Sequence, residues 1–249
     1  MKIIPLGTNG FFPSNGRETT CFATPHKDIL IILDAGSGLF RLAEPEGQKL
    51  LSKIKEVHLF LSHYHLDHTF GFYAAWKLLK GKKVIVFAGA DKKVFSDLVK
   101  DYFPIDYEKE YQNFSWQKLN IGENQTHKYS VRVRKQYHGG RGSLAFRFSF
   151  SLAYVTDSEY SKEGIEFIRD VKLLLHEHYL AGRVGVYFDG KHVTTVGAAA
   201  IAKEAKVGKL ALIHHYPFAD EKQLESQLKL AKSIFPNTVL AKDLEEIEL

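Results

Sequence analysis

The sequence predicts an α/β fold in which two β-sheets pack face to face and carry helices on their outer sides. Its 249 residues are 45% hydrophobic and 25% charged, which is the composition of a globular protein. Short β-prone runs dominate the first 160 residues, whereas helices and strands alternate after Ile165. No linker-like or low-complexity stretch divides the chain. We therefore expect a single domain over residues 1–249.

The first half is expected to consist mainly of strands separated by turns. Thr8-Asn9-Gly10 has turn chemistry, and the runs around it are short and apolar. The expected strands are Lys2–Leu6, Cys21–Thr24, Ile29–Leu33, Val57–Leu61 and Val84–Phe87. Helices are expected over Thr69–Leu79, which is apolar, and over Asp91–Lys100, where Asp91 suits the N-cap.

In the second half, the stretch Tyr129–Tyr137 alternates apolar and polar side chains, as a half-exposed strand does. Further strands are expected at Ser143–Phe150, Leu152–Thr156, Val171–Leu175, Lys209–Ile213 and Thr238–Leu240. Helices over Thr194–Lys206 and Glu221–Phe235 alternate with the later strands.

Charge and cysteine content narrow the class of protein. The formal charge is 34 − 29 = +5, but the lysines are spread along the chain and no Arg-rich block interleaves with aromatics. A solvated surface therefore explains them better than a nucleic-acid partner. No apolar run approaches the roughly 18 residues of a membrane span. The single cysteine, Cys21, excludes an internal disulfide framework and fits a reducing, cytoplasmic location.

Histidine is the unusual feature of the composition, with 12 residues against one methionine. His63-Tyr64-His65-Leu66-Asp67-His68 follows an apolar strand and precedes an apolar helix. In an extended segment the side chains of His63, His65 and Asp67 would converge, with His68 beside them. Imidazoles and a carboxylate suit zinc, manganese or iron. A solvated polar loop would not need apolar elements on both sides, so we favour a metal site.

This pattern, His-x-His-x-Asp-His after an apolar strand, resembles the metallo-β-lactamase superfamily. Asp34-Ala35-Gly36 looks like that family's early Asp-x-Gly motif. Its later metal-binding positions match His138, Asp157 and His214, each of which ends a predicted strand. The resemblance covers roughly residues 1–240. It implies the metallo-β-lactamase fold, a four-layer αββα sandwich of two mixed sheets.

The resemblance also implies a centre that holds two divalent metal ions, with zinc favoured over manganese or iron. The implied ligands are His63, His65 and His138 for one ion, and Asp67, His68 and His214 for the other. Asp157 is the natural bridge, since a two-metal centre needs a shared ligand. Asp34 would support the centre from outside or cap a turn. His215 is an alternative to His214, although the following Tyr216-Pro217 fits the family's turn after the ligand.

Later motifs are similar to the ribonuclease Z and phosphodiesterase branch. In that branch a Glu after a strand orients a His that protonates the leaving oxygen, and Glu177 and His192 match these positions. The pairing is chemically sensible because a carboxylate fixes the imidazole tautomer and raises its basicity. The alternative is that His192 merely precedes a helix capped by Thr194.

One departure concerns the substrate. Ribonuclease Z carries a long arm that holds tRNA between its third histidine and its bridging Asp. Here only 157 − 138 = 19 positions separate His138 from Asp157, and two expected strands fill them. A smaller or cyclic phosphodiester is therefore favoured. The aromatic segment Phe103–Asn113 either walls the pocket and stacks on a base or covers the sheet.

Three functions remain open at this point. The favoured one is a phosphodiesterase in which metal-bound hydroxide attacks phosphorus, Asp67 orients the nucleophile or takes its proton, and His192 acts as the general acid. The second is a ribonuclease Z-like endonuclease that finds RNA through surface lysines. The third is a non-hydrolytic iron redox protein or metal carrier, against which the pair of His192 and Glu177 argues. The oligomeric state, including a homodimer, stays open.

Overall fold

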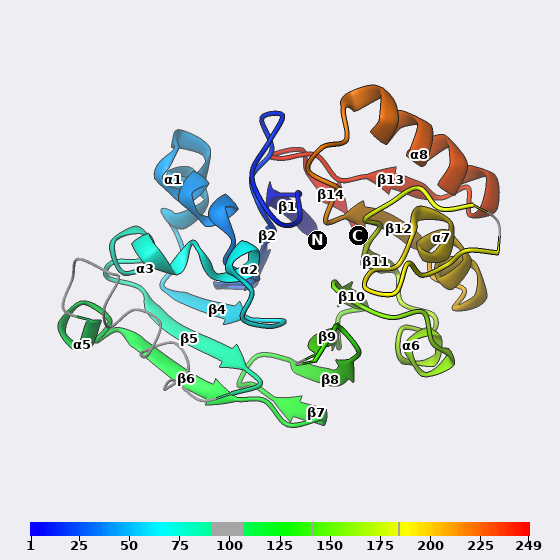
Figure 1. Cartoon of the computed structure of the whole chain (residues 1–249). Helices are drawn as coiled ribbons and strands as arrows, with labels where there is room; N and C mark the ends of the chain where they lie inside the picture. Colours follow the sequence, from blue (N-terminus) through cyan, green and yellow to red (C-terminus); the bar gives the residue numbers. More distant parts are fainter. Residues whose placement is uncertain (91–106, 141, 184) are drawn as a thin grey trace.

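Two mixed β-sheets form the centre of the molecule in the computed structural model, which describes residues 1–90, 107–140, 142–183 and 185–249. The two sheets face each other, and helices lie on their outer sides (Figure 1). The expected helix Asp91–Lys100 and the first part of the segment Phe103–Asn113 fall outside the described residues.

The first sheet has the strand order β14-β1-β2-β3-β4-β5-β6 among the described residues. β3, β4, β5 and β6 run parallel to one another, whereas β1, β2 and β14 pair antiparallel. The strands are β1 (Lys2–Gly7), β2 (Cys21–His26), β3 (Ile29–Leu33), β4 (Glu56–Phe60), β5 (Lys83–Ala88), β6 (Phe114–Lys118) and β14 (Ile247–Glu248).

The second sheet has the order β13-β12-β11-β10-β9-β8-β7 in the same described ranges. Its antiparallel part comes first in the chain, and β10 to β13 then run parallel. The strands are β7 (Gly122–Gln125), β8 (Ser130–Gln136), β9 (Ser143–Phe148), β10 (Leu152–Val155), β11 (Leu173–Glu177), β12 (Lys209–Ile213) and β13 (Thr238–Leu240).

Helices cover the outer face of each sheet. The first sheet carries the 3-10 helix η1 (Ser37–Ala43), α1 (Pro45–Leu51), α2 (Leu66–Thr69), α3 (Phe72–Leu78) and α5 (Tyr107–Glu110). The second carries α6 (Lys162–Phe167), α7 (Thr195–Glu204) and α8 (Glu221–Ile234). No helix in the described ranges is long and apolar enough to cross a membrane.

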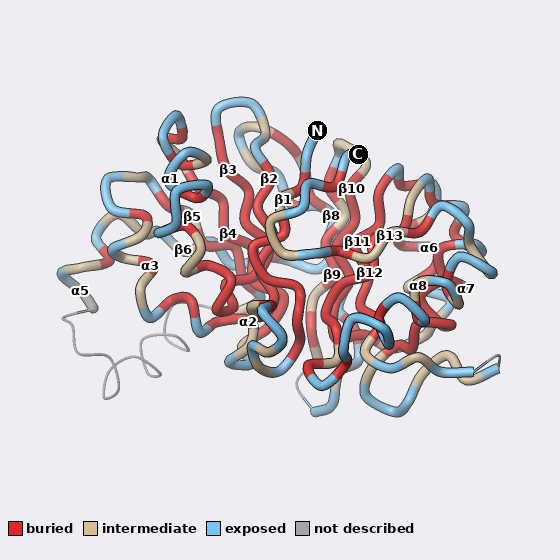
Figure 2. Tube along the Cα trace, turned by 90° about the horizontal axis from the view of Figure 1, so that it is seen from above, coloured by how far each residue is buried: buried red, intermediate tan, exposed pale blue. Residues whose placement is uncertain are grey.

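The order of layers follows from how the strands bury their side chains. In β3, Ile29, Ile31 and Leu33 point into the core between the sheets, whereas Leu30 and Ile32 pack under the helices. A continuous apolar run is what a strand buried on both faces requires. The buried residues lie along the strands and under the helices in Figure 2. The predicted four-layer αββα sandwich of two mixed sheets is therefore confirmed.

The expected helix Thr69–Leu79 was wrong in detail, because two short helices, α2 and α3, meet there. The break lies at Gly71, whose N–H donates to the Ala35 carbonyl over 2.7 Å. The φ of Gly71 is −60°, which is open to any residue. Its role is steric, because an added Cβ would lie 2.5 Å from the Gly36 carbonyl oxygen.

Strands β6 and β7 were not predicted, and neither was the two-residue β14. β6 reads FSWQK and β7 reads GENQ, and neither buries a regular apolar face. Each lies at the edge of its sheet, where side chains can stay solvated and pairing is needed on only one side. β6 is a strand because its backbone pairs with β5, and β7 because its backbone pairs with β8. The pattern of apolar residues in these two segments does not indicate this pairing.

Candidate metal centre

The candidate ligands meet where strands of both sheets end. Asp34 follows β3 and His63 follows β4 in the first sheet, whereas Asp157 and His214 follow β10 and β12 in the second. The carboxyl ends of parallel strands lie at one edge of a sheet, so residues distant in sequence meet there. The site therefore lies between the two sheets at that edge.

The first group of ligands consists of His63, His65 and His138, with one nitrogen of each within 4.8 Å of the others. His138 Nε2 lies 3.3 Å from His65 Nδ1. His63 is buried, and this burial, together with the neighbouring imidazoles, lowers its pKa well below the usual range. A neutral imidazole is the form that binds a metal ion.

The second group consists of Asp67, His68 and His214, again within 4.8 Å. The reasoning that placed Asp67 beside His63 and His65 on an extended segment was wrong. The chain becomes helical at Leu66, so Asp67 and His68 lie in α2 and point to a different position from His65. The structure thus brings Asp67 together with His68 and His214, while His68 also lies within ligand distance of His63 and Asp157.

Asp157 lies between these groups and contacts both. Its Oδ1 is 3.3 Å from His138 Nε2. Its Oδ2 is 3.1 Å from His68 Nε2 and 3.3 Å from His214 Nε2. Burial opposes ionisation of this carboxyl, but the surrounding histidines outweigh it and hold its pKa well below the usual value. A carboxylate that reaches two ligand groups with separate oxygens can bridge two cations.

The nitrogens that face inward fit a cation. His63 Nε2, His68 Nε2 and His214 Nε2 are buried and make no hydrogen bond of normal geometry within the described part of the chain, although the last two face Asp157 Oδ2. A buried polar atom without a partner is costly and needs an explanation. Convergence of these nitrogens with two carboxylates matches the oxygen and nitrogen ligands of zinc, manganese or iron.

Asp34 lies behind the centre and holds His68 in place. Its Oδ2 accepts hydrogen bonds from His68 Nδ1 (2.7 Å) and the Tyr154 hydroxyl (2.6 Å). Both carboxylate oxygens also bond Ser62, one through its backbone N–H and one through its hydroxyl. With Nδ1 of His68 engaged, Nε2 is the nitrogen turned toward Asp67 and Asp157. This is the arrangement that a supporting role requires.

His192 and Glu177 form a pair beside the ligands. His192 Nδ1 is 2.7 Å from Glu177 Oε2 and 3.8 Å from Asp157 Oδ1. Burial lowers the pKa of His192, but the hydrogen bond to Glu177 and the nearby negative charges raise it to about 9. His192 is therefore protonated at neutral pH, as a proton donor must be. Thr194 caps α7, as the alternative interpretation of this segment expected. The cap involves the Thr194 side chain and not His192, so it is compatible with another role for His192.

The geometry distinguishes His214 from His215. Both ring nitrogens of His215 are engaged, one with His178 Nε2 over 2.6 Å and one with the Ala241 carbonyl over 2.8 Å. Burial lowers the pKa of His215 to about 3, so the ring is neutral. His214 faces Asp67 and Asp157 instead. The structure therefore favours His214 as the ligand.

His26, His58 and His127 lie away from the centre. His58 is buried within β4 and bonds the Tyr129 hydroxyl and Glu56. His26 closes β2 and stacks on Phe150. Glu56, His58 and His127 also approach within ligand distance of one another, at the opposite end of β4 from His63.

Two contacts at the centre were missed by sequence reasoning. Tyr179 stacks on His192, with ring centroids 4.4 Å apart and 24° between planes. Gly10 lies against His214, and an added Cβ would fall 2.3 Å from that ring. Tyr179 directly follows the His176-Glu177-His178 motif and Gly10 lies in an early turn, so neither had a periodic or spacing signal.

A cavity of about 560 Å³ opens beside the first ligand group. It is lined by His63 and His65 together with Leu144, Lys135 and Ile121, among others. It is large enough for a small substrate.

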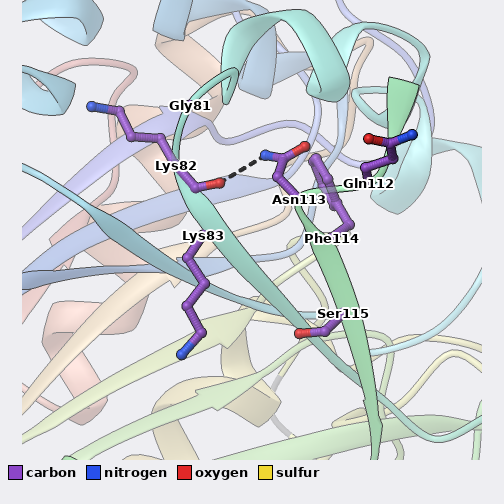
Figure 3. A pocket seen from close by; sticks show the side chains of 7 residues that line it. All are labelled: Gly81, Lys82, Lys83, Gln112, Asn113, Phe114 and Ser115. Atoms are coloured by element: carbon purple, nitrogen blue, oxygen red, sulfur yellow. Dashed lines mark hydrogen bonds between the residues drawn. The ribbon is translucent and has the colours of Figure 1, made fainter. Parts of the chain in front are cut away.

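Another hollow, of about 500 Å³, lies between the turn before β5 and the start of β6, where Asn113 bonds the Lys82 carbonyl (Figure 3). Lys83 in this hollow pairs with Glu56 at the start of β4, whereas the ligands follow the end of β4. This hollow is therefore remote from the metal centre.

Tyr111 shows where the described end of the aromatic segment Phe103–Asn113 packs. Its side chain is buried in the layer under α3, and its hydroxyl donates to the Phe72 carbonyl. The described end of the segment therefore covers the first sheet. Phe103 lies outside the described residues.

Comparison with known proteins identifies the family. Residues 30–215 match the model of the beta-lactamase superfamily domain. The chain is 26% identical over 297 aligned positions to a ribonuclease Z of Saccharolobus solfataricus, covering 100% of this chain and 99% of that protein. A ribonuclease Z of a Synechococcus species is 39% identical over 103 residues, which span 40% of this chain and 32% of that protein.

Solved structures show the same fold. The metallo-beta-lactamase fold protein YhfI from Bacillus subtilis aligns with a TM-score of 0.79 at 24% identity, over 99% of this chain and 98% of that one. A diphosphatase from the PhnP family aligns with a TM-score of 0.74 at 16% identity, over 99% and 96%. The family match, the fold and the clustered His and Asp side chains agree with the resemblance seen in the sequence. The chain belongs to the beta-lactamase superfamily and is a metal-dependent hydrolase.

Proposed function

We propose that this protein is a dinuclear phosphodiesterase that cleaves a small or cyclic phosphodiester. The observation that carries the proposal is the pair of His192 and Glu177 beside two ligand groups joined by Asp157. An alkoxide is a poor leaving group, so an enzyme that releases one benefits from a positioned proton donor. A metal carrier or redox protein has no such need.

Seven side chains would hold the two cations, and zinc is favoured over manganese or iron. They are His63, His65, His138, Asp67, His68, His214 and the shared Asp157. When bound, the cations supply Lewis acidity toward phosphoryl oxygens and acidify the attacking water. The remaining chemistry belongs to residues of this chain.

Asp67 would orient the attacking water. Burial opposes its charge, but His68 and His214 outweigh burial and hold its pKa far below the usual range. A carboxylate that stays ionised accepts a hydrogen bond well and stores a proton poorly. Its Oδ2 also accepts the Phe11 N–H over 2.8 Å, which fixes its direction.

His192 would protonate the leaving oxygen. Glu177 is buried and fixes Nδ1 of His192, so Nε2 is the nitrogen left to face a substrate. Tyr179 stacked on the ring further limits its rotation. Glu177 thus acts as a positioning residue that also keeps the imidazole protonated at neutral pH.

The size of the proposed substrate follows from what this chain lacks. Among the described residues between His138 and Asp157, the structure has the two strands β9 and β10 and no further helix or strand. This supports a small phosphodiester over a large RNA.

The test is hydrolysis with a defined metal. Purified protein loaded with Zn²⁺ or Mn²⁺ is expected to cleave bis(p-nitrophenyl) phosphate or a 2′,3′- or 3′,5′-cyclic nucleotide. His65→Ala is expected to lose activity and one bound metal equivalent together, and His26→Ala, far from the centre, serves as the matched control. Full activity in His65→Ala would overturn the proposal. Bound iron without hydrolysis of any ester would favour the redox or carrier function.

A second candidate, an RNA-processing endonuclease, is favoured by the name of the relatives, ribonuclease Z. Gel shifts with a precursor tRNA at low salt test it, because lysine-driven binding should weaken steeply as salt rises. Absence of binding at low salt would exclude this candidate.

A further inference from the structure

Five aromatic rings contact one another in a row beside the metal centre, and we call this row the arc: Tyr179, Tyr216, Phe218, Phe12 and Phe11. The arc begins at Tyr179, which stacks on His192 and lies 5.6 Å, centroid to centroid, from His214. One end of the arc therefore touches both the proposed proton donor and a candidate ligand.

Each ring of the arc contacts the next. Tyr179 and Tyr216 are 5.2 Å apart, and Tyr216 and Phe218 are 5.5 Å apart. Phe218 meets Phe12 at 5.2 Å, and Phe12 meets Phe11 at 5.4 Å. The inner rings are shielded by their neighbours, but Phe11 is 70% exposed and Phe218 is 68% exposed.

The far end of the arc returns to the centre through the backbone of Phe11. The Phe11 N–H donates to Asp67 Oδ2 over 2.8 Å. Phe11 also has a φ of 62°, in the left-handed region that bulky residues rarely adopt. Strained backbone of this kind persists where surrounding contacts hold it, and such positions cluster at functional sites.

We infer that the exposed rings of Phe11 and Phe218 bind a planar ring carried by the substrate, such as a nucleobase. This inference rests on the proposed function, because it assigns the phosphoryl group to the metal centre and the ring to the arc. Exposed aromatic rings contribute little to the core, whereas stacking on a base gains binding energy for any base.

The charge distribution of the aromatic rings in the arc predicts which end of such a substrate binds there. The face of an aromatic ring carries negative charge density, so it does not attract a phosphate. It does attract the partly positive edge of another ring, and two rings can also stack face to face when they are offset. A nucleotide would therefore bind in one sense, with its phosphate at the histidines and its base on the arc.

Calorimetric titration of the zinc-loaded protein tests this with two ligands that differ only in the base. Thymidine 5′-phosphate is expected to bind roughly tenfold more tightly than 2-deoxyribose 5-phosphate, as stacking on one or two rings provides. Phe11→Gly and Phe218→Ala are each expected to reduce that ratio severalfold. Glycine suits the left-handed backbone and keeps the N–H that bonds Asp67, so Phe11→Gly should fold.

Lys27→Gly is the matched control, because Lys27 has a similar φ of 56° in the turn between β2 and β3. The ratio of the affinities for the two ligands in Lys27→Gly is expected to equal the ratio in the unchanged protein. The inference would be overturned if the ratio of the affinities for the two ligands were the same in the unchanged protein, in Phe11→Gly and in Phe218→Ala. A change of oligomeric state with equal ratios would instead assign the rings to a protein interface.

Hydrolysis measured on the same samples separates this inference from the proposed function. Turnover of bis(p-nitrophenyl) phosphate without a preference for the base leaves the phosphodiesterase standing and removes the ring site. A preference for the base without turnover of any phosphodiester removes the phosphodiesterase and keeps the ring site. Failure of both ligands to bind would also overturn the ring site.

Discussion

Several side chains of the centre project from unusual backbone. Asp34, Asp157 and His214 have φ values of 58°, 49° and 57°, in the left-handed region. Asp and His tolerate this region better than bulky apolar residues do. Each of them lies just past a strand end, where the left-handed residue turns the chain aside and directs the side chain between the sheets. The geometry of the centre is thus fixed in the backbone as well as in the side chains.

The role of His192 predicts a dependence on the leaving group. His192→Ala is expected to slow hydrolysis of a 2′,3′-cyclic nucleotide by about 10²–10⁴-fold, the usual contribution of general acid catalysis. It should slow bis(p-nitrophenyl) phosphate far less, because p-nitrophenolate leaves without a proton. Steady-state rates on both substrates measure this, and an equal loss on both would contradict the role.

The pKa of His192 predicts a pH profile. The protonated fraction of this ring is full below its pKa of about 9 and falls above it, so the rate on the cyclic nucleotide should fall as the pH rises through about 9. Glu177→Gln removes the negative charge that raises this pKa, so the fall should move to lower pH. A fall at the same pH in Glu177→Gln would show that another group titrates.

Replacement of Asp34 is expected to weaken metal binding, although Asp34 is not itself a proposed metal ligand. Asp34→Asn weakens the bond to His68 Nδ1 and is expected to reduce affinity for zinc by about 10- to 100-fold, as for other residues that support a metal ligand. Titration against a chelator of known affinity measures it. Asp28→Asn, an exposed residue in the turn before β3, is the control and should bind zinc as the unchanged protein does.

At the scale of elements, the short helix α2 is clamped to the loop after β3. The Ala35 N–H donates to the His68 carbonyl over 2.9 Å, and the Gly71 N–H donates to the Ala35 carbonyl over 2.7 Å. These bonds hold Asp67 and His68 against Asp34 regardless of helix propensity. A four-residue helix has little stability alone, so tertiary contacts determine it.

Gly71→Ala is therefore expected to destabilise the fold by about 1–3 kcal/mol, the usual cost of overpacking. The added Cβ would lie 2.5 Å from both the Gly36 carbonyl oxygen and Leu39 Cβ, and backbone cannot yield easily. Urea unfolding measures the change. Gly140→Ala meets no atom within 4 Å and should unfold as the unchanged protein does. Equal stability of both variants would contradict the clamp.

At the scale of the molecule, the two sheets share the centre. The segment after β4 supplies His63, His65, Asp67 and His68, and the second sheet supplies His138, Asp157 and His214. A cation bound there would tie the two sheets together at the edge where their strands end. Binding to the folded state alone should then stabilise the whole fold.

Removal of metal is expected to lower the melting temperature. Each site filled at about 100 times its Kd adds about 2.7 kcal/mol to the free energy of unfolding. Calorimetry of chelator-treated protein, before and after addition of Zn²⁺, measures the difference, and elemental analysis should give two equivalents. Added Mg²⁺ is the control, because histidine-rich sites suit it poorly. An unchanged melting temperature with Zn²⁺ would contradict a shared centre.

The sequence by itself determined the fold class and the candidate residues of the centre. β3, β12 and β13 have the predicted bounds, because apolar runs bounded by turns leave a chain few choices. The cluster from His63 to His68 identified the metal chemistry, because ligand type and close spacing are properties of the chain itself.

Only the tertiary structure decided what depends on distant neighbours. The split between α2 and α3, the edge strands β6 and β7, and the position of Asp67 beside His68 all follow from packing or pairing with other segments. The contact of Tyr179 with His192 and the arc that ends at Phe11 join residues from three separate loops. Local sequence records the preference of a segment, whereas such contacts exist only once the two sheets have packed and brought their strand ends together.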